Sequence, residues 1–115
     1  MKKDDYKRLL SDIEAEGKIE GSCIVSRDGM LIHSETKDIH AETFAAMSAT
    51  LLSSAEVAMD EIKGGVPKKV VVDGKSKRII VVGAGPNALL AVITSANGHD
   101  IYDIIEKSAK KLEIF

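Results

Sequence analysis

The sequence has few of the residues on which nucleic-acid-binding and disulfide-stabilised proteins depend. It contains no tryptophan, two tyrosines and two phenylalanines, so few rings are available to stack on bases. A balance of 16 basic and 18 acidic residues leaves a formal net charge of -2, which gives no overall attraction to phosphate backbones. Its single cysteine, Cys23, cannot form a disulfide within the chain. We therefore expect neither a nucleic-acid-binding protein nor a disulfide framework.

Long apolar runs are absent as well. No segment approaches the roughly 20 apolar residues that a membrane-spanning helix needs. The opening residues MKKDD are not followed by the apolar stretch of a signal peptide, so we expect no transmembrane segment and a cytoplasmic location. With 115 residues, of which 44% are hydrophobic and 30% charged, the chain can build one core, and we predict a single domain over residues 1–115.

The hydrophobic pattern and the turn residues predict three helices and five strands. An amphipathic helix is expected before Gly17, a β-hairpin around Asp28-Gly29, and a helix of about six to seven turns over residues 39–63, which contain no proline or glycine. Strands are expected over residues 67–73, 77–82 and 88–95, with the last helix after Asn97-Gly98. The order α-β-β-α-β-β-β-α, with its hairpins, predicts an α+β fold built on a mainly antiparallel sheet.

The predicted β-hairpin brings apolar side chains to one side. If its turn consists of Asp28-Gly29 alone, Val25 lies opposite Ile32 and Ile24 lies opposite His33. The side chains then expected to share one side are those of Cys23, Val25, Met30 and Ile32. Because Cys23 and His33 point to opposite faces in this register, they cannot act together as a nucleophile and its base.

The stretch IIVVGAGPNA, residues 79–88, has the G-x-G-x-x-A pattern of a dinucleotide-binding loop. Such a loop must lead into a helix and a second parallel strand, which carries an acidic residue about twenty positions on. Here only the run 88–95 follows before Asn97-Gly98, and Glu106 lies within the last predicted helix. We therefore expect a tight connection between two strands and no bound cofactor, with a flavin or nucleotide enzyme as a remote alternative.

Other groups that could support catalysis or metal binding lack a suitable arrangement. The sequence DGKS at residues 73–76 resembles the end of a phosphate-binding loop, but Lys69 stands where that loop needs its first glycine. His33, His40 and His99 share no short metal-ligand spacing. We therefore predict no catalytic, cofactor-binding or metal-binding residues.

The long predicted helix is poor in charge. The residues between Glu42 and Glu56, TFAAMSATLLSSA, contain no charged side chain, although a helix on a sheet needs only one apolar face. The stripe expected to pack on the sheet is made of Phe44, Met47, Leu51, Ala55, Ala58 and Ile62. The opposite stripe of mostly small side chains, predicted to receive a partner helix, is made of Thr43, Ala46, Thr50, Ser53 and Val57. The alternative is an exposed helix without a partner.

Basic residues gather between positions 63 and 78. The cluster is made of Lys63, Lys68, Lys69, Lys75, Lys77 and Arg78, with Asp73 as its only acid. Lysines on an edge strand often serve only to prevent aggregation, and Pro67 at the start of the predicted strand 67–73 indicates such an edge. The alternative for this cluster is docking of an acidic partner or of a membrane surface.

Three segments in this order resemble the Roadblock/dynein light chain family: the hairpin GSCIVSRDGMLIHSE, the long helix AETFAAMSATLLSSAEVAMDEI and the strand-turn-strand RIIVVGAGPNALLAVITS. The resemblance covers nearly the whole chain. It implies a five-stranded antiparallel sheet with the long helix on one face and the terminal helices on the other. It also implies a homodimer, in which the third strands join edge to edge and the long helices pair. The interface residues predicted on this basis are Ala46, Thr50, Ser53, Val57, Val70, Val71 and Val72.

The function that the resemblance implies is not enzymatic. Dimers of the family bind or regulate small Ras-like GTPases, act as scaffolds or attach to motor complexes. Bacterial and archaeal members are similar to a bacterial polarity regulator that binds a Ras-like GTPase across its paired helices. We therefore expect a homodimeric regulatory or scaffold module for a small GTPase, and the alternative is a structural adaptor of a motor or sensor complex. The polar residues expected to contact the partner are Glu42, Glu56, Asp60 and Lys63.

Overall fold

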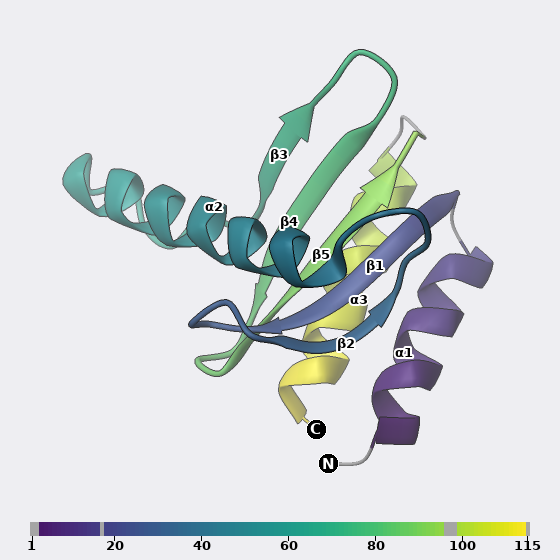
Figure 1. Ribbon diagram of the computed structural model, residues 1–115. Coiled ribbons are helices and arrows are strands. Elements are labelled where there is room, and N and C mark those ends of the chain that lie inside the picture. Colours follow the sequence, from purple (N-terminus) through teal and green to yellow (C-terminus); the bar gives the residue numbers. More distant parts are fainter. Residues whose placement is uncertain (1–2, 17, 96–98, 115) are drawn as a thin grey trace.

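The structure of the protein is a computed structural model, which describes residues 3–16, 18–95 and 99–114. Its helices and strands follow each other in the predicted order (Figure 1). The elements are α1 (Lys3–Glu16), β1 (Ile19–Ser26), β2 (Leu31–Glu35), α2 (Ala41–Glu61), β3 (Val70–Asp73), β4 (Arg78–Ala84), β5 (Ala88–Thr94) and α3 (His99–Ile114). The helix stop predicted at Gly17 and the turn predicted at Asn97-Gly98 lie outside the described residues.

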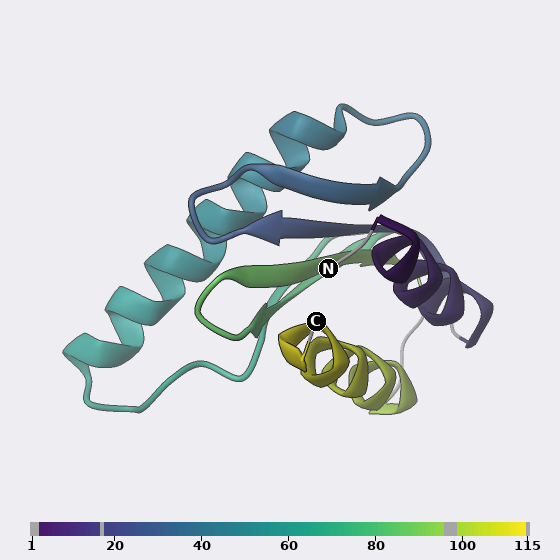
Figure 2. The ribbon, with the colours of Figure 1, turned by 90° about the horizontal axis from the view of Figure 1, so that it is seen from below.

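All the strands belong to one antiparallel sheet with the order β2-β1-β5-β4-β3. Helix α2 lies on one face of this sheet, and α1 and α3 lie side by side on the other face (Figure 2). The predicted α+β class and the arrangement of layers implied by the resemblance are therefore confirmed. Strands β2 and β3 form the two edges of the sheet, so the edge position predicted for β3 is confirmed as well.

The two faces of the sheet bury two separate cores, because side chains alternate along each strand. The larger core lies between the sheet and the helices α1 and α3, and it includes the fully buried Leu10, Ile24 and Ile105. The smaller core lies under α2 and consists mainly of short side chains: Cys23, Val25, Ala45, Ala49, Leu52, Val81, Leu89 and Ala91. The core under α2 therefore contains fewer and smaller apolar side chains than the core under α1 and α3.

The turn between β1 and β2 is one residue longer than predicted. The Gly29 amide donates to the Ser26 carbonyl, and the Ser26 amide donates to the Met30 carbonyl at 2.8 Å. Gly29 has a φ of 93°, which supplies the positive backbone angle that a loop of three residues requires. Met30 lies opposite Ser26 and is exposed, so its predicted place on the same side as Cys23 and Val25 is wrong.

The longer turn also changes which residues of β2 reach the core. Ile24 pairs with His33 as predicted, but Val25 pairs with Leu31 instead of Ile32, across a β-bulge. Leu31 therefore packs against the core under α2. Ile32 is 39% exposed, and its predicted place beside Val25 is wrong.

Strand β3 is shorter than predicted because its first residues leave the sheet. It begins at Val70 rather than at Pro67 and pairs with residues 78–81 of β4. Pro67 has no amide hydrogen and cannot donate to a ladder of strands. β4 continues to Ala84, so its residues 82–84 run beyond the end of β3.

One buried polar atom under α2 is unsatisfied. The side chain of Ser48 is 1% exposed, and its hydroxyl has no hydrogen-bond partner among the described residues. Because burying such a group costs free energy and alanine is the better helix former, we expect Ser48→Ala to raise the free energy of unfolding by about 1 kcal/mol in urea denaturation. Ser54→Ala, on the exposed side of α2, controls for helix propensity. An equal gain in both variants would contradict the role of burial.

Candidate functional site

Helix α2 packs on the sheet through a different stripe from the one predicted. Its buried residues are Ala45, Ser48, Ala49 and Leu52. Met47, from the predicted stripe, is 55% exposed, and Ile62, just beyond the helix, is 71% exposed. The larger side chains favour the predicted stripe on hydrophobicity alone, but the space under α2 accepts mostly short side chains. The prediction that this stripe faces the sheet is therefore wrong for Met47 and Ile62, whereas Phe44 is half-buried and packs against the core under α2 as predicted.

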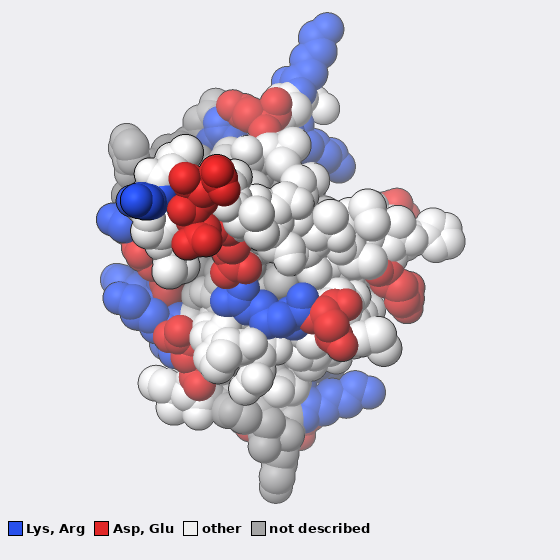
Figure 3. Space-filling model, turned by 90° about the vertical axis from the view of Figure 1, so that its left-hand side faces the viewer, with Lys and Arg blue, Asp and Glu red and all other residues white. Residues whose placement is uncertain are grey.

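Between Glu42 and Glu56 the exposed surface of α2 is uncharged, with the apolar Met47 among several serine and threonine side chains. Met47, Leu51 and Ala58 share one flank of the helix, and Leu51 is half-buried there. Val57 is 71% exposed on the outer side. The side of the molecule where α2 ends carries a broad area of uncharged side chains with charges around it (Figure 3). Because Met47, Leu51 and Ala58 form an apolar flank beside this uncharged area, the surface is a candidate for binding a protein.

The residues of α2 predicted to form a dimer interface lie mostly at the surface. Thr50, Ser53 and Val57 are exposed. Ala46 is half-buried beside the turn between β1 and β2, where Gly29 approaches its backbone closely. Of the four interface positions predicted on this helix, only Ala46 is therefore partly covered by the chain itself.

The predicted interface residues on β3 lie at the edge of the sheet. Val71 and Val72 are 36% and 39% exposed, and the half-buried Val70 packs against the core under α2. As an edge strand, β3 presents backbone groups that can pair with another strand. An open strand edge and the apolar surface of α2 therefore lie next to each other, since α2 also contacts β3.

Among the polar residues predicted to contact a partner, Glu42, Asp60 and Lys63 are exposed. Glu56 differs from them, because its carboxylate accepts a hydrogen bond from Arg27 at 3.0 Å. Sequence reasoning missed this ion pair, since the two residues are 29 positions apart and no local pattern connects them.

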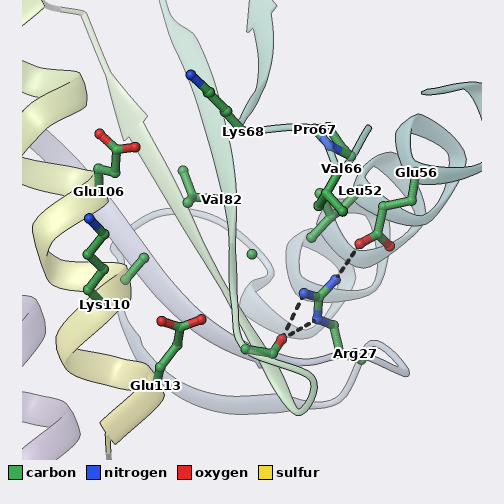
Figure 4. A pocket seen from close by; sticks show the side chains of 13 residues that line it. Arg27, Leu52, Glu56, Val66, Pro67, Lys68, Val82, Glu106, Lys110 and Glu113 are labelled. Carbon is green, nitrogen blue, oxygen red and sulfur yellow. Dashed lines mark hydrogen bonds and ion pairs between the residues drawn. The ribbon is translucent and has the colours of Figure 1, made fainter. Parts of the chain in front are cut away.

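Arg27 joins three parts of the fold. From the turn between β1 and β2, its guanidinium donates to Glu56 on α2 and, at 3.1 and 2.8 Å, to the carbonyl of Gly85 between β4 and β5 (Figure 4). A side chain at Gly83 would begin 2.8 Å from Arg27 Nη2, so only glycine leaves this space free. The glycine loop that resembled a dinucleotide site thus accommodates an arginine of the same chain.

The basic cluster of residues 63–78 is partly neutralised. Lys77 forms an exposed ion pair with Glu20 at 3.2 Å, and Arg78 forms one with Asp73 at 3.2 Å. The lysines of the cluster that remain exposed without an ion pair among the described residues are Lys63, Lys68, Lys69 and Lys75, and Lys69 lies over the Tyr102 ring. The cluster therefore keeps a positive surface on the connection between α2 and β3 and at the tip of the β3–β4 hairpin.

No arrangement for catalysis is evident among residues 3–16, 18–95 and 99–114. Within them, no group of three or more His, Cys, Asp or Glu residues could hold a metal ion. Cys23 is buried, and burial raises the pKa of its thiol, which makes it a poorer nucleophile at neutral pH. Cys23 and His33 lie on opposite faces of the sheet, as predicted. The imidazole of His33 contacts the carboxylate of Glu35 instead. None of the described helices is long and apolar enough to cross a membrane.

Comparisons with known proteins agree with this fold. The sequence pattern of the Roadblock/LC7 domain matches residues 5–94. The uncharacterized protein MJ0310 of Methanocaldococcus jannaschii is 30% identical over 90 residues, which span 77% of this chain and 78% of that protein. Among solved structures, Myxococcus xanthus MglB is similar with a TM-score of 0.89 at 14% identity, covering 99% of this chain and 96% of MglB. A Roadblock/LC7 domain from Streptomyces avermitilis is similar with a TM-score of 0.85 at 22% identity, covering 93% of both chains.

Proposed function

The chain belongs to the Roadblock/LC7 domain family, and we propose that it acts as a homodimeric, non-enzymatic module that binds a small Ras-like GTPase. The observation that carries the proposal is the uncovered apolar surface of α2 beside the open edge of β3. Such a surface suits a macromolecular partner better than a small molecule, which needs an enclosed pocket with convergent polar groups.

A second copy of the chain is the first partner that this surface fits. Pairing of β3 with β3 of another copy would extend the sheet and remove both open edges. The two-fold axis of that contact would place a second α2 beside the first, where it would cover Met47, Leu51 and Ile62. The interface positions predicted from the sequence remain part of this proposal: Ala46, Thr50, Ser53, Val57, Val70, Val71 and Val72.

The paired helices would then offer a shared platform to a GTPase. Glu42, Asp60 and Lys63 are exposed near the two ends of α2 and can make polar contacts there. Glu56 is a weaker candidate for direct contact, because Arg27 already holds its carboxylate. A protein that regulates a switch must bind its two states unequally, since equal affinity shifts no equilibrium.

Affinity purification from the source organism, followed by titration, tests this function. We expect the protein to recover a Ras-like GTPase and to bind its GTP-analogue and GDP forms with affinities that differ at least about tenfold, which corresponds to about 1.4 kcal/mol. Isothermal titration calorimetry on the purified GTPase measures both affinities.

Charge reversal on α2 supplies the matched control for this titration. Asp60→Lys should weaken binding, whereas Glu106→Lys on α3, across the sheet from α2, should leave it unchanged. Equal affinity for both nucleotide states would leave a plain scaffold. Recovery of motor or sensor components without a GTPase would favour the structural adaptor instead.

A further inference from the structure

A strand position beside β4 is vacant. The last residue of β4 that pairs with β3 is Val81, but β4 continues to Ala84. On the side away from β5, the stretch 82–84 has no strand partner among the described residues. If β3 were extended in its own register, Pro67 would lie opposite Ala84, and it has no backbone N–H with which to continue the ladder there. The chain therefore leaves an unpaired strand edge within its own fold.

A cavity of about 410 Å³ lies at this edge. Its walls come from the connection at Val66–Lys68, from α2 at Leu52 and Glu56, and from α3 along Glu106–Glu113 (Figure 4). A second cavity of about 230 Å³ shares Lys68, Val82 and Glu106 with the first and continues along α3. Together they form one groove, which follows the outer edge of β4 between α2 and α3 and is here called the β4 groove.

The β4 groove has an apolar floor and unequal rims. Val82 and Ala109 are 8% and 3% exposed, so the floor is already desolvated. On the α3 rim, Asp103, Glu106 and Glu113 are acidic and Lys110 is basic. The opposite rim is the connection between α2 and β3, and it carries Lys68 without an acidic neighbour in the sequence from residue 62 to residue 72.

The cations around the groove are not equally available. Arg27 reaches the groove, but its three hydrogen bonds to Glu56 and Gly85 occupy it. Lys69 places its ammonium 4.4 Å from the centre of the Tyr102 ring. Lys68 is exposed and forms no ion pair among the described residues, so it can meet an acidic side chain in the groove.

We propose that the β4 groove binds an extended, acidic segment of a partner polypeptide, which pairs with residues 82–84 of β4 as an added strand. Backbone hydrogen bonds to β4 would provide affinity, and alternate side chains would point toward α2 and toward α3. An acidic side chain beside the connection would pair with Lys68. This site leaves the exposed surface of α2 and the outer edge of β3 free, so it does not depend on the dimer or on the GTPase.

Titration with short peptides tests the proposal directly. The probe is a capped pentapeptide of alternating valine and glutamate, added to the ¹⁵N-labelled protein. We expect the largest amide shifts within residues 82–84, at those whose backbone N–H points away from β5, because new hydrogen bonds form there. The same peptide with alternate backbone amides methylated should not bind, since it cannot pair as a strand. Equal binding of the methylated peptide, or no shifts at millimolar peptide, would overturn the proposal.

Two charge reversals distinguish binding of the peptide in the β4 groove from nonspecific attraction of the peptide to basic surfaces. Lys68→Glu should weaken binding of the acidic peptide at least about tenfold. Lys75→Glu makes the same change at the tip of the β3–β4 hairpin, outside both cavities, and should leave binding within about twofold. Equal losses in the two variants would overturn the assignment to the groove. A peptide with lysine in place of glutamate should bind wild type more weakly, and a preference for it would also contradict the proposal.

Discussion

Replacing Leu51 by Arg is expected to convert the protein into a monomer at micromolar concentration. Leu51 is half-buried on the flank of α2 that carries Met47 and Ala58, and the proposed dimer would bury it fully. Removing an unpaired guanidinium from water costs several kcal/mol. A cost of about 3 kcal/mol corresponds to more than about a hundredfold weaker association. The more exposed Val57→Arg should weaken the dimer by the same mechanism but to a smaller degree.

Sedimentation equilibrium over a range of concentrations measures this effect. Glu106→Arg, which introduces the same residue on α3 across the sheet, should associate like wild type. Circular dichroism should show native helix content in all the variants, because Leu51 and Val57 are not among the buried residues of the fold. A wild-type protein that is monomeric at micromolar concentration would contradict the proposed dimer.

Replacing Arg27 by Ala is expected to lower the free energy of unfolding by about 2 kcal/mol. The variant loses the charge-assisted hydrogen bonds to Glu56 and to the Gly85 carbonyl. The Glu56 side chain is 38% exposed, so water takes over part of that interaction and keeps the loss moderate. The loss should also loosen the second half of α2, which has no buried residue after Leu52 and projects past the sheet in Figures 1 and 2. Hydrogen exchange should therefore rise over residues 53–61.

Gly83→Ala tests the same network from the other side. A Cβ atom 2.8 Å from Arg27 Nη2 forces the guanidinium to move, so we expect a loss of about 1 kcal/mol, smaller than that of Arg27→Ala. When Arg27 is already absent, Gly83→Ala should cost little, and this non-additivity separates the network from independent local effects. Lys77→Ala breaks the exposed pair with Glu20 and should leave the free energy of unfolding nearly unchanged. Additive losses at Arg27 and Gly83 would contradict the direct contact.

Turns and strand ends show how far local sequence predicts this fold. Asp28-Gly29 correctly marks the hairpin, because glycine is needed where the backbone turns with positive φ. The same dipeptide does not reveal that Arg27 belongs to the loop, and that extra residue decides that Leu31 rather than Ile32 reaches the core. Pro67 correctly indicates an edge strand, but β3 begins three residues later than predicted, at Val70. That difference depends on where the connection from α2 first meets β4.

By itself, the sequence determined the order of helices and strands, the antiparallel sheet and the tight connection between two strands at the glycine loop. These conclusions rest on hydrophobic period, turn residues and segment lengths, which are properties of neighbouring residues in the chain. Only the tertiary structure decided which stripe of α2 meets the sheet, because that depends on how much space the strands leave beneath the helix. Only the tertiary structure also brought Arg27 to Glu56 and Gly83, which are 29 and 56 positions away, since contacts at such separations form by packing and leave no local signal.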